Sequence, residues 1–167
     1  MEKPDAKKVK KVIMEAPIGS YLGEDGAQIF AERACAELHF KDSEFLYKKG
    51  DLENSFYIVT KGRFGIINEI EKDKKPRIMH VLEKGDLVGE LSFIDDTPHT
   101  ASIMALGDAS VLCFKAEDIK PLVTEEPEVM FDFMRAIIKR VHHTLADIGK
   151  QQMALSTYIS TGSYGHR

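Results

Sequence analysis

A glycine, a carboxylate and a short helix interrupt an apolar segment in the middle of the chain, and their spacing suits anion binding. The segment VGELSFIDDTPHTASIMAL, residues 88–106, begins as a strand, turns at Gly89-Glu90, forms a short amphipathic helix through Asp95 and returns to strand after His99. Gly89 permits close approach of the backbone to a ligand, and the amides after it point from the start of a helix, where anions bind. The pattern predicts a ligand pocket.

Other residues that carry catalytic or metal-binding chemistry do not form a matching pattern. His39, His80 and His99 each stand alone, and the adjacent pair His142-His143 would point about 100° apart on a helix, which does not suit a shared metal. The sequence shows neither a Ser-His-Asp nor a phosphate-loop signature. We therefore expect no catalytic residues, no metal site, no cofactor and no enzyme activity.

The elements that must position the pocket are predicted from the change of apolar period along the chain. From Phe40 onward, runs rich in aromatic and β-branched residues indicate strands, namely SEFLYKKGD, SFYIVTKGRFGIIN, RIMHVLEKGD and ASVLCFK. Gly-Asp pairs beginning at residues 50, 85 and 107 indicate turns with positive φ. Lys61-Gly62 indicates a hairpin turn and the charged stretch 68–77 a hairpin tip. These strands predict a jelly-roll β-barrel.

Helical periods precede and follow the strands. Residues 1–38 contain two helical patterns, one ending before Pro17 and one that places Ile29, Phe30, Ala34 and Leu38 on one face. A third helix is predicted from Pro127 to about Leu155. The expected fold class is α+β, mainly β, in four segments: a helical or flexible N-terminal segment (1–19), the β-roll (20–126), the C-terminal helix (127–155) and a flexible tail (156–167).

The C-terminal helix carries two apolar stripes. Val129, Phe133 and Ile137 are expected to face the barrel. A second stripe repeats at alternating spacings of four and three: Met134, Ile138, Val141, Leu145, Ile148, Gln152 and Leu155. Leaving such side chains in water forgoes about 1.5–3 kcal/mol each. We therefore expect a homodimer through residues 134–155, and the alternative is that this helix folds back on the barrel.

Composition narrows the function classes. Asp and Glu (27) outnumber Lys and Arg (23), for a formal net charge of −4, so a nucleic-acid-binding surface is not expected. Cys35 lies in a helical pattern and Cys113 in an apolar run, so both are interpreted as buried apolar residues in a reducing compartment. No segment has the ~20 apolar residues of a membrane span or the pattern of a secretion signal. A cytoplasmic protein with no membrane partner is expected.

The chain resembles a known family. The order of helix, KKGDLENSFYIVTKGRFGI, GDLVGELSFIDDTPHTASIMA, SVLCFKAEDI and a long helix is similar to the cyclic nucleotide-binding domain of catabolite-activator-type regulators and cyclic-nucleotide-dependent kinases, over residues 20–150. The resemblance implies that the segment from Gly89 is a phosphate-binding cassette. It assigns Glu90 to the ribose 2′-hydroxyl, assigns the amides of Leu91 and Ser92 to the phosphate, and implies cyclic AMP or cyclic GMP as ligand.

The cassette departs from the family pattern at one position. Where the family has an arginine after Thr-Pro, this chain has His99, and an imidazole lacks the permanent charge and paired donors of a guanidinium. Loss of a charged hydrogen bond costs about 1.5–3 kcal/mol. Either the protein binds a cyclic nucleotide weakly, with His99 as a partial substitute, or it is a degenerate roll that serves as a dimeric protein-interaction module.

Two threonines bear on the choice of base. The resemblance aligns Thr100 with a threonine common in cyclic-GMP-selective members, although its interpretation as an ordinary β-branched strand residue is at least as good. It aligns Thr144 with the helix threonine that touches adenine in the catabolite-activator type. The two point to different bases. The expected function is a stand-alone bacterial regulatory protein that signals through its C-terminal helix or an unidentified protein partner, with no room for a DNA-recognition helix.

Overall fold

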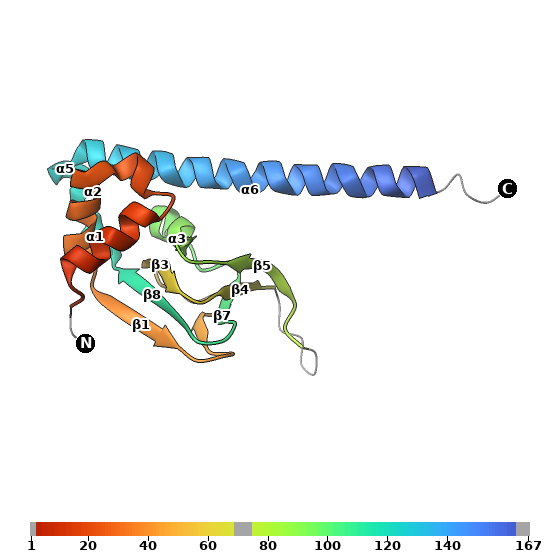
Figure 1. Ribbon diagram of the computed structural model, residues 1–167, viewed down its shortest axis with the longest axis horizontal. Coiled ribbons are helices and arrows are strands. Elements are labelled where there is room, and N and C mark those ends of the chain that lie inside the picture. Colours follow the sequence, from red (N-terminus) through yellow and green to blue (C-terminus); the bar gives the residue numbers. More distant parts are fainter. Residues whose placement is uncertain (1–2, 69–74, 163–167) are drawn as a thin grey trace.

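The computed structural model describes residues 3–68 and 75–162. Eight strands and six helices are found within these residues (Figure 1). In chain order the elements are α1 (Ala6–Glu15), α2 (Gly19–Arg33), β1 (Ala36–Phe40), β2 (Phe45–Tyr47), β3 (Phe56–Lys61), β4 (Phe64–Ile67), β5 (Ile78–Leu82), β6 (Leu87–Val88), α3 (Glu90–Asp95), β7 (Ser102–Ala105), β8 (Ala109–Phe114), α4 (Ala116–Ile119), α5 (Leu122–Glu125) and α6 (Pro127–Gly162).

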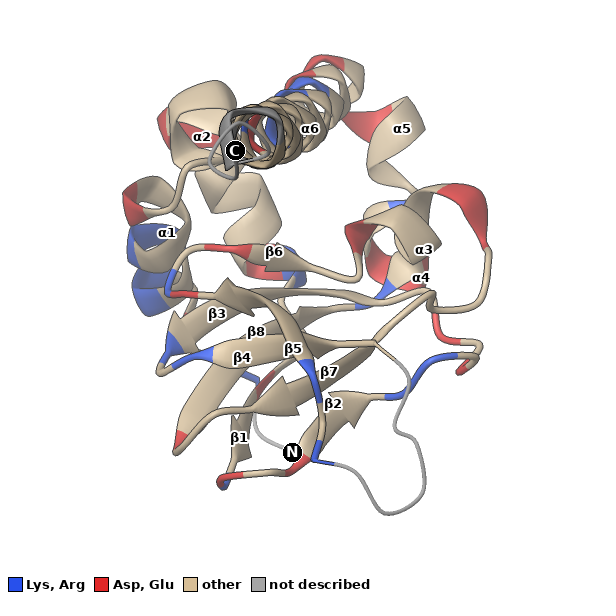
Figure 2. Cartoon of the chain, turned by 90° about the vertical axis from the view of Figure 1, so that its right-hand side faces the viewer, with Lys and Arg blue, Asp and Glu red and all other residues tan. Residues whose placement is uncertain are grey.

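The strands form the predicted jelly-roll. One sheet has the order β1-β8-β3-β6 and the other β2-β7-β4-β5, with antiparallel neighbours throughout. Strand β3 is apolar on both faces because each face packs into a different hydrophobic core. Phe56 and Ile58 pack toward the helices, whereas Tyr57 and Val59 pack between the sheets. Figure 2, which looks along α6, shows the helices gathered over the sheet that contains β3 and β6.

The second helical pattern ends earlier than its sequence predicts. Helix α2 stops at Arg33, and residues 36–40 form β1, so the assignment of Leu38 to a helical face is wrong. The segment ACAEL has good helix-forming residues, but pairing with β8 overrides that preference. Cys35 accordingly lies outside the helix, where its amide donates to the carbonyl of Cys113 at 2.9 Å. Both cysteines are free, and Cys113 is buried as expected.

The turn at Lys61-Gly62 does not close a hairpin, contrary to its sequence prediction. Strands β3 and β4 on either side of it lie in different sheets, so the turn carries the chain from one sheet to the other. Gly62 has φ 70°, and a Cβ there would come within 2.3 Å of the Asp108 carbonyl oxygen. The three Gly-Asp turns have the predicted positive φ. Strands β4 and β5 pair as a hairpin, but residues 69–74 of its expected tip lie outside the described residues.

Helix α6 is longer than predicted and does not fold back on the roll. It continues beyond Leu155 to Gly162, so residues 156–162 are helical rather than a flexible tail. Its first turns pack against α2 and α5 with Phe133 and Ile137 buried, and the rest projects past the roll (Figure 1). Among the described helices, α6 included, none has the length and apolarity required to cross a membrane.

Candidate ligand-binding site

The cassette begins at a glycine that no other residue could replace without strain. Gly89 joins β6 to α3 with φ 76°. A Cβ at this position would lie 3.2 Å from the Ser55 carbonyl oxygen and 3.4 Å from Cε1 of His99. The backbone at Gly89 therefore passes close to Ser55 and His99, which lie beneath the cassette and form its floor. Phe93 anchors α3 from below through an edge contact with Phe56, with ring centroids 5.1 Å apart.

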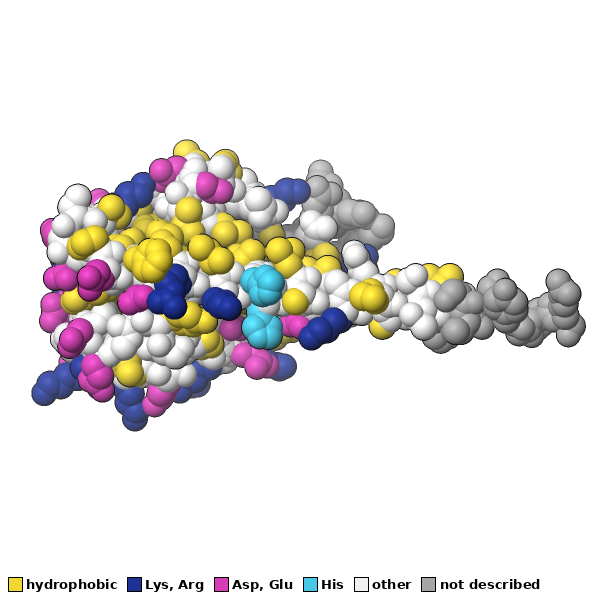
Figure 3. Space-filling model, turned by 90° about the horizontal axis from the view of Figure 1, so that it is seen from above, with side chains coloured by type: hydrophobic (Ala, Val, Ile, Leu, Met, Phe, Trp, Pro, Cys, Tyr) yellow, Lys and Arg dark blue, Asp and Glu magenta, His cyan; other side chains and the backbone are white. Residues whose placement is uncertain are grey.

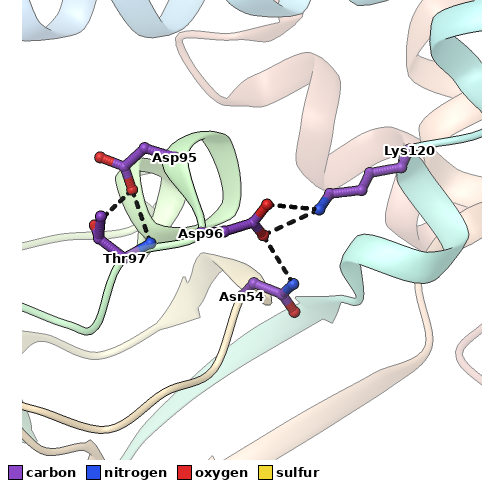
Figure 4. A network of polar contacts seen from close by, with 5 residues as sticks. All are labelled: Asn54, Asp95, Asp96, Thr97 and Lys120. Carbon is purple, nitrogen blue, oxygen red and sulfur yellow. Dashed lines mark hydrogen bonds and ion pairs between the residues drawn. The ribbon is translucent and has the colours of Figure 1, made fainter.

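Polar contacts hold the far end of the cassette (Figure 4). Asp96 ends α3 in the left-handed conformation. Its carboxylate accepts bonds from Lys120 at 3.0 Å and from Asn54 at 3.1 Å, and these partners lower the pKa of Asp96. Asp95 accepts a bond from the Thr97 hydroxyl at 2.6 Å. The short helix is thus tied to the segments that precede β3 and follow α4.

A cavity of about 180 Å³ lies above the cassette. Five of the seven predicted ligand residues line it, namely Gly89, Glu90, Leu91, Ser92 and Thr100. The cavity is smaller than the roughly 300–1,000 Å³ typical of ligand pockets. Leu91, which lines the cavity, is more than half exposed.

Glu90 is paired with a cation that comes from α6. Nη1 of Arg140 lies 3.1 Å from Oε1 of Glu90 and also donates to the carbonyl oxygen of Leu87. The side chains of Glu90 and Arg140 are 12% and 29% exposed. Burial raises the pKa of Glu90 above its ordinary value, an effect that Arg140 partly opposes. The cavity therefore contains a desolvated carboxylate and a guanidinium in contact.

His99 lies beneath the cassette and does not line the cavity. Its ring stacks on Tyr47, with centroids 3.5 Å apart and planes 8° apart, and Nδ1 is 3.0 Å from Oγ of Ser92. Its Nε2 is buried with no hydrogen-bond partner among the described residues. Burial lowers the pKa of His99, although Glu53 and Asp51 raise it. The imidazole is therefore neutral near pH 7 in this arrangement.

Thr144 is the other predicted ligand residue that the structure does not bring to the cavity. It is exposed on α6, and its hydroxyl donates to the carbonyl oxygen of Arg140 at 3.1 Å. Arg140 itself was not predicted from the sequence. It continues the stripe Val129, Phe133 and Ile137, where a cation following three inward-facing apolar residues could have indicated a polar contact with the roll.

Comparison with known proteins gives the family. The chain matches the cyclic nucleotide-binding domain family over residues 37–126, more than half of its length. Lysophospholipase NTE1 of Cryptococcus neoformans is 30% identical over 104 residues, which are 62% of this chain and 6% of the relative. cGMP-dependent protein kinase, isozyme 2, of Drosophila melanogaster is 22% identical over 158 residues, which are 92% of this chain and 17% of the kinase.

A solved structure shares most of the fold. A cyclic nucleotide-binding domain from Methylobacillus flagellatus KT matches with a TM-score of 0.72 at 17% identity, covering 87% of this chain and 85% of that one. This chain belongs to the cyclic nucleotide-binding domain family. It spans less than a fifth of the length of the two curated relatives above.

Proposed function

We propose that the protein is a regulatory sensor that binds cyclic AMP or cyclic GMP at the cassette. The observation that carries the proposal is the buried carboxylate of Glu90 in the same cavity as Gly89 and Ser92. A desolvated carboxylate is stabilised by a hydroxyl donor, which the ribose 2′-OH of a cyclic nucleotide supplies. The amides of Leu91 and Ser92 then face the phosphate.

The position of the threonines favours one base. Thr100 lines the cavity, where its hydroxyl oxygen can accept a hydrogen bond from the guanine amino group, whereas Thr144 is exposed and bonded to its own helix. We therefore expect cyclic GMP to bind more tightly than cyclic AMP. Because His99 is neutral and lies below the cassette, it does not replace the charged bond of the family arginine. Both affinities should be about ten- to hundredfold weaker than is usual for the family unless another cation supplies that charge.

Paired titrations of each cyclic nucleotide and its 2′-deoxy analogue test this function. Saturable heat at one site per chain is expected, with about a tenfold or greater loss for the analogue, because Glu90 then remains desolvated without a donor. Equal affinity for the two forms would remove Glu90 from ribose recognition. The absence of both binding heat and a thermal shift at millimolar nucleotide would overturn the proposed function.

A second candidate, a dimeric protein-interaction module, is favoured by the exposed face of α6. Ile138, Leu145, Ile148 and Leu155 are between 46% and 67% exposed, and the same heptad spacing continues to exposed Ile159. Figure 3 shows apolar side chains along α6 from the roll toward its projecting half. We propose that a second copy covers the stripe within residues 134–155, because two helices with heptad repeats pair along their apolar seams. Met134 and Val141 already pack partly against the chain's own core, so the exposed positions carry the contact.

Nucleotide binding and dimerisation are compatible in one mechanism, whereas a degenerate roll would dimerise without binding nucleotide. Ligand binding at the cassette moves α3, α6 is re-seated, and the face that α6 presents to its partner changes. The protein in this proposal is cytoplasmic and non-enzymatic, and it passes its signal to an unidentified protein partner. Sedimentation at micromolar concentration tests the dimer. A monomer under those conditions would leave the exposed heptad without the partner proposed here.

A further inference from the structure

We propose that Arg140 supplies the counter-charge for the ligand phosphate and that it acts as a latch between α6 and the cassette. This inference rests on the proposed function and assigns a role that the cassette residues do not fill. Among the described residues that line the cavity, Arg140 is the only one with a cationic side chain. A phosphate in a partly desolvated cavity requires such a charge.

The guanidinium has the donors for this role. Its bonds to Glu90 and to the Leu87 carbonyl both leave from Nη1. A guanidinium carries five N–H donors in one plane, and its fork matches two oxygens of a phosphate. When a nucleotide enters, the 2′-hydroxyl donates to Glu90 and the phosphate accepts from Arg140. The ligand thus separates a carboxylate and a cation and satisfies each of them.

The position of Arg140 along α6 links the ligand to the exposed heptad. Ile137, three residues before it, is 2% exposed, and Val141, just after it, still packs partly against the core, whereas Leu145 is 63% exposed. Arg140 therefore lies within the last turn of α6 that packs against the core, before the half of the helix that projects past the roll. Without ligand, its bonds to Leu87 and Glu90 fix this turn against β6 and α3. When the guanidinium bonds to a phosphate instead, α6 loses its attachment to Leu87 and Glu90. The direction in which the projecting half of α6 extends from the roll then changes.

Calorimetric titrations with cyclic GMP test the assignment. The variants are Arg140→Gln, which removes the charge, and Arg140→Lys, which keeps the charge but loses the fork. Arg135→Gln is the matched control, because Arg135 lies on the same helix, is 55% exposed and pairs with Asp132 at 3.0 Å. We expect about a ten- to hundredfold loss for Arg140→Gln, an intermediate loss for Arg140→Lys and no change for Arg135→Gln.

Salt dependence separates a charge contact from a merely structural role. The affinity of the unmodified chain should fall with ionic strength, and Arg140→Gln should flatten that dependence. Thermal unfolding of each variant checks that the roll remains folded, and Arg140→Lys keeps the test valid if Arg140→Gln does not fold. Binding by Arg140→Gln that equals or exceeds the unmodified chain would overturn the assignment. No binding by the unmodified chain would instead overturn the proposed function, and the role of Arg140 with it.

Discussion

Two basic side chains flank the cassette, and their surroundings give them opposite properties. His99, below it, is 4% exposed, stacked on Tyr47 and neutral because burial lowers its pKa. Arg140, above it, is 29% exposed, cannot lose its proton and contacts the carboxylate that the ligand is proposed to use. His99, the basic residue within the cassette, is therefore part of the floor. Arg140, which is 50 positions from Glu90 in the chain, is the residue proposed to provide the charge for the ligand phosphate.

The largest effect on folding is expected at the floor. His99→Ala removes a stacked ring and the partner of Ser92, so we expect a loss of about 2–4 kcal/mol in the free energy of unfolding. His39→Ala is the control, because His39 is exposed on β1 and should change stability by less than about 0.5 kcal/mol. Urea denaturation measures both. A loss at His99 no larger than at His39 would show that the floor contributes little.

The next largest effect on the free energy of unfolding is expected at Gly89, the turn between the floor and the cavity. Gly89→Ala places a Cβ at φ 76° against the Ser55 carbonyl and should cost about 1–3 kcal/mol and weaken nucleotide binding. Gly149→Ala is a control of opposite sign. No atom lies within 4 Å of its Cβ position on α6, so the change should stabilise the helix by about 0.5–1 kcal/mol. If Gly89→Ala stabilises the protein while Gly149→Ala destabilises it, this account of the cassette backbone is contradicted.

The projecting half of α6 should change association without changing the roll. Leu145→Glu with Ile148→Glu adds charge to two exposed heptad positions, so a dimer should become a monomer at micromolar concentration. The unfolding midpoint of the roll at the dissociated concentration should stay the same. Sedimentation velocity and thermal unfolding provide the two measurements. A dimer that survives both substitutions would place the interface elsewhere.

The pH dependence of stability gives a smaller effect. The pKa of His99 is lower in the folded protein than the unfolded value of about 6.5, so the unfolded chain binds a proton first as the pH falls. The contribution of neutral His99 is complete above about pH 6.5 and is lost as the pH falls toward the folded pKa. The stability difference between the unmodified chain and His99→Gln should therefore shrink on acidification from pH 7.5 to 5.5. A difference that grows would mean that His99 is protonated in the fold.

Most of the fold is predictable from periodicity, whereas the charge in the site is not. Alternating and apolar runs identify β3, β4, β5 and β8, and the glycine at position 89 marks the cassette. Strand β1 is missed because its local preference is helical and only its pairing with β8 decides its conformation. The apolar stripe before Arg140 could have indicated that this residue faces the roll, but its pairing with Glu90 depends on how α6 packs over the roll, which no local pattern specifies.

The central claim is that the ligand charge comes from α6 and not from the cassette histidine. One set of titrations with cyclic GMP, on the unmodified chain, His99→Gln and Arg140→Gln at one salt concentration, tests it most directly. The account predicts about a ten- to hundredfold loss for Arg140→Gln and a loss of less than about threefold for a folded His99→Gln, since the neutral imidazole contributes no charge. The reverse order, with His99→Gln the more damaging, would contradict it.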